Sequence, residues 1–184
     1  VERSRGLGDV YKRQGYNYQK TIHMRSVDVC LTHQDFDNYD HKGKIVIVID
    51  VLRATSTINT LLFLGADHVR PIGSLEECKS LKDHDYIIMA ERLGKKVEGF
   101  DYGNSPTKLT EKDIKGKKVA IATSNGSKAI IKSEGSEMTI LCSFLNIESV
   151  INRIKKSESD VILLCSGWLG KTNLEDLSLI HISE

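Results

Sequence analysis

Short apolar runs alternate with amphipathic stretches along most of the chain. Runs rich in Val, Ile and Leu that end at a polar residue or a glycine are typical of buried strands. They lie at residues 27–32, 44–50, 68–72, 86–90, 118–123, 138–142 and 160–165. Apolar positions at helical spacing lie at residues 55–65, 74–81, 126–132 and 147–156. This alternation predicts an α/β fold of three layers, with a mainly parallel sheet between helices on both faces.

Two local signals refine this picture. Ser74 followed by Glu77 has the spacing of a capping box and predicts the start of a helix. Residues 91–115 form the longest irregular stretch, which is too long for an ordinary connection between elements.

Polar residues follow most of the predicted strands. Ligands bind at the carboxyl ends of the strands in open parallel α/β sheets, so we expect these residues to form one site. The groups are residues 50–57, 91–92 with 101–105, 124–126, 143–146 and 166–172. Ordinary helix capping is an equally good explanation for residues 124–126 and 143–146, because Ser and Asn are preferred caps.

Asp50 and Arg53 are harder to explain by capping, which needs neither a carboxylate nor a guanidinium at the end of a buried strand. Arg53 and the backbone N–H groups of Thr55, Ser56 and Thr57 would together donate to a phosphate. The Asp50 carboxylate could hold Mg²⁺, which favours few carboxylates plus substrate oxygens. A purely structural ion pair between Asp50 and Arg53 is the alternative.

Further charged residues invite the same interpretation. Glu91 and Asp101 could be metal ligands or could form surface salt bridges. Arg92 could be a second phosphate-binding residue or simply exposed. Glu175 and Asp176 could bind the metal or act as a general base, and acidic residues at a helix start are the alternative.

Spacing excludes some familiar chemistries. An aspartyl-phosphate phosphatase needs Asp-x-Asp, but Leu52 stands at the second position. A cysteine phosphatase needs Cys-x5-Arg, but Lys171 stands at that place after Cys165. Residues 170–172 match only the end of a phosphate-binding P-loop, so nucleotide binding remains a weak alternative.

Charge and composition exclude several partner classes. The net charge is +1 and basic residues are scattered, which gives no sign of nucleic-acid binding. No apolar stretch reaches the length of a membrane span. The four cysteines are far apart, which suits a reducing cytoplasm, and the histidines lack zinc-site spacing. A homo-oligomer is left open.

Five motifs occur in an order that resembles the 2-phosphosulfolactate phosphatase family. They read VIDVLRATSTI, AERLGKKVEGFDYGNSP, ATSNGSKAI, CSFLNIESV and LLCSGWLGKTNLED. The resemblance implies an α/β, Mg²⁺-dependent phosphatase. Its reaction would convert 2-phospho-3-sulfolactate to 3-sulfolactate and phosphate, a step associated with coenzyme M biosynthesis. The alternatives are a phosphatase for another small phosphorylated acid and a non-catalytic module that binds a phosphorylated or sulfonated metabolite.

This hypothesis assigns roles to the polar groups. Asp50, Arg53, Glu91 and Asp101 would be catalytic, and Asp50, Glu91, Asp101, Glu175 and Asp176 would be the metal ligands. The substrate would be held by Arg53, Thr55, Ser56, Thr57, Arg92, Asn104, Ser105, Ser124, Asn125 and Gly126. Mg²⁺ would neutralise phosphate charge and activate a water molecule.

The two ends of the chain read as foreign sequence. Residues 7–14 (LGDVYKRQ) and 177–184 (LSLIHISE) can be encoded by a perfect inverted repeat, which resembles a sequencing-library adaptor. We expect residues 1–23 to be adaptor and translated leader without a fixed fold, residues 24–176 to form the domain, and residues 177–184 to be an adaptor tail. Family members run on past the final motif, so we expect the C-terminal part of the domain to be missing and stability and activity to be low.

Overall fold

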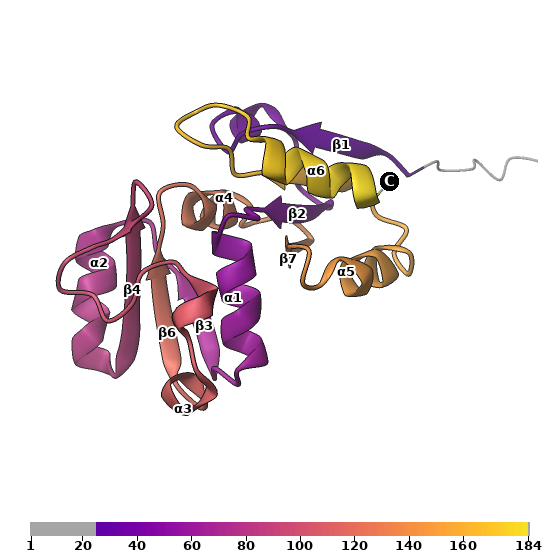
Figure 1. Cartoon of the computed structure of the whole chain (residues 1–184). Coiled ribbons are helices and arrows are strands. Elements are labelled where there is room, and N and C mark those ends of the chain that lie inside the picture. The colour runs from indigo at the N-terminus through magenta and orange to yellow at the C-terminus, as the bar shows by residue number, and fades with distance from the viewer. Residues whose placement is uncertain (1–24, 184) are drawn as a thin grey trace, which may run out of the picture.

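The computed structural model describes residues 25–183, and the predictions for residues 1–23 lie outside this range (Figure 1). The strands are β1 (Val27–Cys30), β2 (Ile45–Ile49), β3 (His68–Pro71), β4 (Tyr86–Arg92), β5 (Lys95–Lys96), β6 (Lys118–Ala122), β7 (Met138–Cys142) and β8 (Val161–Cys165). The α-helices are α1 (Ala54–Phe63), α2 (Leu75–Ser80), α3 (Glu111–Ile114), α4 (Gly126–Lys132), α5 (Ile147–Ile154) and α6 (Leu174–Ser183). Three short 3-10 helices are η2 (Asp35–Asn38), η3 (Leu81–His84) and η4 (Pro106–Lys108).

Every predicted strand and helix is present, with each end within two residues of the prediction. The Ser74 hydroxyl accepts a hydrogen bond of 3.0 Å from Glu77 N, which confirms the predicted cap of α2. The sequence pattern missed β5, α3 and η4 in the irregular stretch. These elements are two to four residues long and mostly polar, so they leave no periodic signal.

The strands form two sheets. Sheet A has the order β1-β8-β2-β7 and is parallel throughout, whereas sheet B has the order β3-β6-β4-β5 with only β5 antiparallel. This arrangement confirms the predicted α/β class with mainly parallel pairing. Ile49 is in register with both Cys142 and Cys165, and Ala90 is in register with Ala122. The carboxyl ends of neighbouring strands therefore lie level within each sheet.

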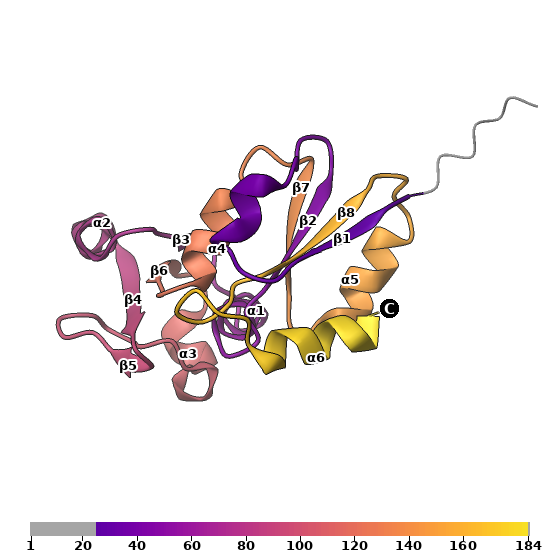
Figure 2. The same cartoon turned by 90° about the horizontal axis from the view of Figure 1, so that it is seen from above.

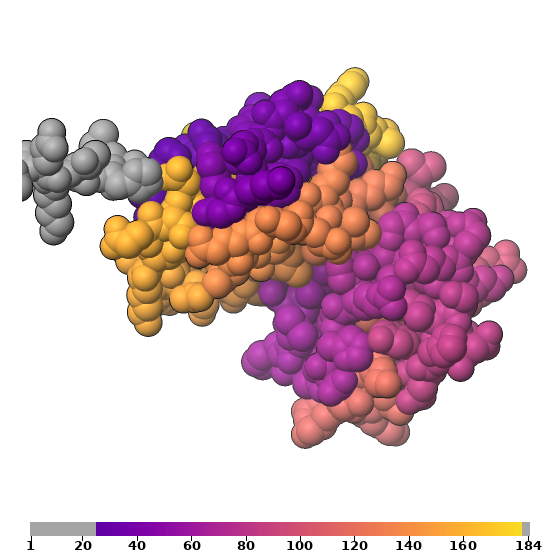
Figure 3. All heavy atoms as spheres, turned by 180° about the vertical axis from the view of Figure 1, so that it is seen from behind, coloured from indigo at the N-terminus to yellow at the C-terminus, as the bar shows by residue number. Residues whose placement is uncertain are grey.

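Helices cover the sheets and separate them (Figures 1 and 2). Helices α1 and α4 contact each other and lie between the two sheets. Helices α5 and α6 pack on the other face of sheet A, and α2 packs on the other face of sheet B. Seen from behind, the molecule has two lobes, one around each sheet (Figure 3).

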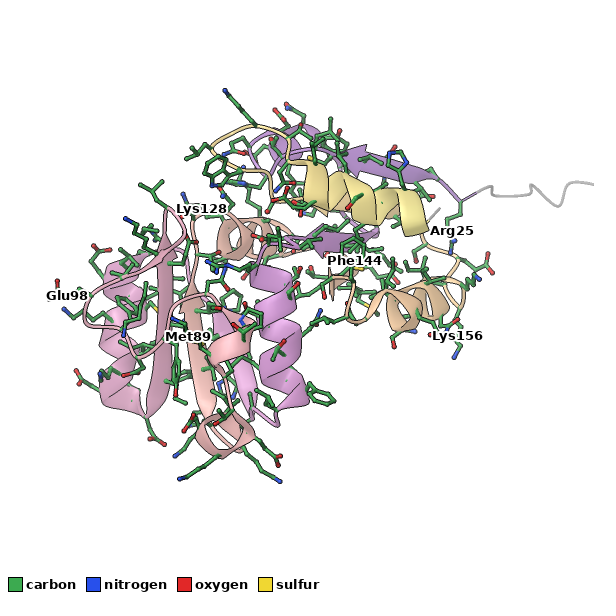
Figure 4. All side chains as sticks on the ribbon, in the orientation of Figure 1. Arg25, Met89, Glu98, Lys128, Phe144 and Lys156 are labelled. Carbon is green, nitrogen blue, oxygen red and sulfur yellow. The ribbon has the colours of Figure 1, made fainter. Side chains whose placement is uncertain are left out.

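An apolar cavity of about 410 Å³ lies beside sheet A. Its walls come from one face of β1, β2 and β8, from α5, and from Leu179 of α6. Arg25 lines one end, where its guanidinium donates to Ile154 O at 2.8 Å and to Ser157 O at 3.0 Å (Figure 4). We call this space the apolar groove.

Helix α6 includes most of the segment that we expect to be adaptor-derived. Leu179 and Ile180 of that segment are buried against sheet A and α5. Within residues 25–183, no helix is both long and apolar enough to span a bilayer.

Candidate functional site

Strand β2 places Asp50 at the edge of sheet A. All five β2 residues are buried Ile or Val, which suits a central parallel strand covered on both faces. Asp50 follows directly and is 7% exposed. Its Oδ1 accepts a hydrogen bond of 3.0 Å from Ala54 N, and its backbone carbonyl accepts one of 3.1 Å from Thr55 N. Asp50 therefore also fixes the start of α1.

Gly126 lies against the other side of the Asp50 carboxylate. A Cβ atom added at Gly126 would collide with Asp50 Oδ2 and with the Cβ of Ala54. Only glycine can therefore start α4 this close to the carboxylate. The first residues of α1 and α4 thus enclose Asp50 from two sides.

The environment of Asp50 favours its protonated form. Burial raises the pKa of the Asp50 carboxyl above its usual range, and the negative charge of Glu91 adds to the rise. Hydrogen bonds from Ala54, Ser166 and the Arg53 backbone lower the pKa but do not outweigh burial. A nearby cation would favour the charged form of Asp50. This carboxylate is therefore suited to bind a metal ion or a cationic group of a ligand.

A polar pocket of about 80 Å³ lies beside Asp50. It opens between the carboxyl ends of β2 and β8 in sheet A and those of β4 and β6 in sheet B. Of the predicted site residues, it is lined by Asp50, Arg53, Glu91, Asn104, Ser124, Asn125 and Glu175. The carboxyl-end rule thus located the site, but the site lies between two sheets.

Gly94 joins two of the charged groups. Gly94 N donates to Glu91 Oε1 at 2.5 Å, and Gly94 O accepts from Arg53 Nη2 at 3.2 Å. Gly94 has a φ of 78°, which favours glycine at this turn between β4 and β5. Sequence reasoning gave Gly94 no role, although a glycine between two strand-like segments is a turn signal.

Two amide side chains in the pocket have buried oxygen atoms without partners. Within residues 25–183, no hydrogen bond reaches Asn104 Oδ1 or Asn173 Oδ1. Buried polar atoms are normally paired, so these oxygens are available to a cation, a water molecule or a ligand donor. Asn173 was not predicted, because a lone Asn before a helix reads as an ordinary cap.

The pocket offers a cation only a few protein ligands. No cluster of three or more His, Cys, Asp or Glu side chains suited to a metal occurs among the described residues. Asp50 and Glu91 nevertheless line one pocket with the free amide oxygen of Asn104. Mg²⁺ commonly takes one or two carboxylates and fills its remaining positions with water and substrate oxygens.

Several donors at the start of α1, which the sequence predicted to bind phosphate, already have acceptors within the protein. Thr55 N and Thr57 N donate to the carbonyls of Asp50 and Arg53 at 3.1 and 2.9 Å. The hydroxyls of Thr55 and Ser56 donate to backbone carbonyls at 2.8 and 2.7 Å. None of Thr55, Ser56 and Thr57 lines the pocket, so in this structure they shape the Asp50 turn.

Further predicted residues do not line the pocket, namely Arg92, Asp101, Ser105, Gly126 and Asp176. Asp101 forms an ion pair of 3.0 Å with Lys82, which is the surface alternative that the sequence left open. Arg92 Nη1 donates to Glu91 O at 2.7 Å and Ala122 O at 3.3 Å, so its guanidinium ties β4 to β6. Ser105 contacts Thr107 at 3.2 Å between their hydroxyls.

Asp176 is fully buried behind the pocket, whereas Glu175 lines it. Asp176 Oδ1 accepts a hydrogen bond of 2.9 Å from Val51 N, and its Oδ2 has no hydrogen-bond partner among the described residues. Burial raises the pKa of Asp176 to about 7, and the charge of Asp50 contributes to the rise. Asp176 therefore supports the turn after Asp50 from the side of α6.

The segment that matches the end of a P-loop is a tight turn. Trp168 N donates to Lys171 O at 2.7 Å, and Lys171 N donates to Trp168 O at 3.0 Å. Lys171 is exposed, and α6 begins only at Leu174. In a P-loop the helix begins at the Gly-Lys-Ser/Thr end of the loop, whereas this turn closes before α6 begins, so it does not have P-loop geometry.

Comparison with known proteins identifies the family. The profile of the 2-phosphosulpholactate phosphatase family matches residues 30–180. A relative from Caldanaerobacter subterraneus subsp. tengcongensis is 40% identical over 150 residues, which cover 79% of this chain and 62% of the relative. One from Clostridium acetobutylicum is 38% identical over 153 residues, which cover 82% of this chain and 65% of the relative.

A third relative, from Thermotoga maritima, is 41% identical over 136 residues, which cover 74% of this chain and 59% of the relative. All three relatives are described as probable 2-phosphosulfolactate phosphatases. The chain thus spans less than two thirds of the length of these relatives. The match over residues 30–180 includes every residue that lines the polar pocket, and the chain belongs to the 2-phosphosulpholactate phosphatase family.

Proposed function

We propose that this chain carries the catalytic site of a Mg²⁺-dependent phosphatase that hydrolyses 2-phospho-3-sulfolactate to 3-sulfolactate and phosphate. The observation that carries this proposal is the pocket in which Asp50, Glu91 and Arg53 meet. Two carboxylates and a guanidinium in one small pocket suit a cation together with a phosphate group. The names of the relatives supply the substrate.

Each residue has a role in this proposal. Asp50 and Glu91 hold Mg²⁺, with Asn104 Oδ1 as a further oxygen ligand. Bound Mg²⁺ would neutralise phosphate charge and lower the pKa of a water molecule. Arg53 binds the phosphate oxygens, and Ser124 and Asn125 at the end of β6 orient the ester.

Phosphate release tests the proposal directly. The purified chain is incubated with 2-phospho-3-sulfolactate in Mg²⁺ and, separately, in a chelator. We expect release only with Mg²⁺, and a loss of at least about 100-fold for Asp50→Asn or Arg53→Ala, since charge stabilisation is usually the largest catalytic contribution. Asp101→Asn is the matched control, because Asp101 lies outside the pocket.

The outcome of this assay separates the alternative functions. Binding of 3-sulfolactate without phosphate release would instead support a non-catalytic module. Faster release from another small phosphorylated acid would change the substrate but keep the mechanism. Full activity of Asp50→Asn would exclude the role of Asp50.

The setting of the reaction is part of the proposal. All four cysteines are free and buried, which fits a reducing compartment. We therefore propose that the enzyme works in the cytoplasm, and the family resemblance supports a role in coenzyme M biosynthesis. Separating membrane-enclosed compartments from the cytoplasm and assaying each for the activity tests the location.

A further inference from the structure

The turn at residues 167–171 has an unusual backbone. Gly167, Leu169 and Gly170 have φ values of 66°, 51° and 74°. Positive φ is uncommon for a non-glycine residue such as Leu169 and persists only where the surroundings hold it. Two backbone hydrogen bonds between Trp168 and Lys171 close the turn.

The base of this turn is packed against the body of the protein. A Cβ atom on Gly167 would lie 2.9 Å from Lys171 O and 3.2 Å from the side chain of Thr32. His33 holds the preceding residue, since its Nδ1 lies 2.6 Å from Ser166 O. The backbone position of Trp168 is therefore set by the fold.

Trp168 stands at the mouth of the polar pocket. It lines the pocket and is nevertheless 58% exposed, and Leu52, another lining residue, is 67% exposed. No hydrogen bond from the indole N–H to an acceptor occurs within residues 25–183. An aromatic ring with a free donor, carried on a well-held backbone and exposed at a pocket, is suited to contact a ligand.

The size of the pocket indicates which part of a ligand would contact Trp168. A volume of about 80 Å³ is small beside the roughly 300–1,000 Å³ of pockets that enclose whole ligands. With a cation present, the space suits a phosphate group. The remainder of a phosphorylated acid would lie at the mouth, beside the indole.

We propose that Trp168 binds the non-phosphate part of the substrate, with its ring against the substrate carbons and its N–H donating to an anionic oxygen of the acid group. This inference rests on the proposed function, because it requires the phosphate to occupy the pocket. It makes Trp168 a residue that determines specificity among phosphate esters. The contact is remote from the reacting bond, so it affects binding more than the chemical step.

Steady-state kinetics with 2-phospho-3-sulfolactate test the role of Trp168. We expect Trp168→Ala to raise KM about tenfold and to leave kcat within about twofold. Trp168→Phe keeps a ring but loses the donor, so we expect a rise of about threefold in KM. Leu169→Ala is the matched control, because Leu169 is the next residue of the turn, is 61% exposed and does not line the pocket.

Fluorescence gives a readout that does not depend on turnover. Trp168 is the only tryptophan of the chain. We expect 3-sulfolactate with Mg²⁺ to change its emission in a saturable way, and inorganic phosphate with Mg²⁺ to change it much less. Calorimetry on the same samples measures whether each ligand binds.

The outcomes distinguish this inference from the proposed function. Turnover with an unchanged KM for Trp168→Ala overturns the inference and keeps the phosphatase. Bound 3-sulfolactate that changes Trp168 emission without any turnover supports the inference and overturns the phosphatase. Calorimetric binding of 3-sulfolactate without a change in emission overturns the inference, and an absence of both binding and turnover overturns both.

Discussion

At the scale of single residues, the site depends on how closely the backbone surrounds Asp50. One carboxylate oxygen is held by Ala54 N, and the other faces Gly126 across a gap that no side chain could enter. Asp176 supports the following residue through Val51 N. The direction of the Asp50 carboxylate is therefore determined by neighbours that need not touch the substrate.

Gly126→Ala should displace this carboxylate. The new methyl group would collide with Asp50 and Ala54, so we expect a loss of about 1–3 kcal/mol in the free energy of unfolding and a fall of at least about tenfold in kcat/KM. Denaturant unfolding and phosphate release measure the two effects. Gly73→Ala is the control, because its Cβ would make only an ordinary contact of 3.5 Å with Ile131. Equal behaviour of the two variants would contradict this account.

Asp176 should make stability depend on pH. Its pKa rises from 3.8 to about 7 in the folded state, so the folded chain binds more protons than the unfolded chain between these values. The contribution of Asp176 to stability should therefore be greatest below about pH 4 and should be lost as pH rises to about 7, by about 4 kcal/mol for a shift of this size.

Asp176→Asn should flatten that dependence in metal-free buffer. Asn keeps an acceptor for Val51 N but does not titrate, so the fall in the free energy of unfolding between pH 4 and pH 7 should shrink. Asp50 also has a raised pKa and should leave a residual slope. Denaturant unfolding at a series of pH values measures how the free energy of unfolding depends on pH. An unchanged slope in Asp176→Asn would show that Asp176 does not cause this dependence.

At the scale of elements, the local sequence pattern predicts each strand and helix, but it does not predict which strands pair with one another. Strand β2 could be recognised because five consecutive Ile and Val residues end at a carboxylate. The same pattern cannot tell whether β3 joins β2 or lies in another sheet, since buried parallel strands read alike. Asp101 and Glu91 both lie in the stretch around β4, yet only the fold shows that Glu91 enters the pocket and Asp101 does not.

Neighbouring leucines of α1 should differ sharply in their effect on stability. Leu61 is fully buried among residues of sheet B, whereas Leu62 is 50% exposed. We expect Leu61→Ala to cost about 2–5 kcal/mol through lost burial and a residual cavity, and Leu62→Ala to cost about 0.5 kcal/mol or less. Urea unfolding of both variants compares them. Similar costs would mean that α1 does not pack against sheet B as described.

At the scale of the whole molecule, function depends on how the two lobes face each other. The pocket takes Asp50 from sheet A and Glu91 from sheet B, and α1 and α4 keep the sheets apart. Sequence reasoning predicted both carboxylates because each follows or ends a strand. It could not predict the lobes, because their arrangement comes from packing between residues far apart in the chain.

The apolar groove beside sheet A should bind a hydrophobic dye in the native chain. Its volume of about 410 Å³ is lined mainly by aliphatic side chains, including the half-buried Ile151. We expect Ile151→Glu to weaken binding of anilinonaphthalene sulfonate severalfold, because a carboxylate in the groove opposes entry of an apolar ring and repels the sulfonate of the dye. Phe63→Glu is the control, since Phe63 is 89% exposed and lies outside the groove. Equal dye affinity for both variants would place the dye elsewhere.

Buried cysteines make it possible to measure how often each of the two lobes opens. Burial raises the pKa of Cys78 and Cys142 to about 11 and that of Cys165 to about 12, so their thiols react only after the surrounding structure opens. Cys78 lies in the core beside sheet B, whereas Cys142 and Cys165 lie in the core beside sheet A. The rate at which a thiol reagent modifies each cysteine therefore reports how often its own lobe opens. The natural sequence thus carries reporters of local opening on both sides of the polar pocket, and no cysteine has to be introduced.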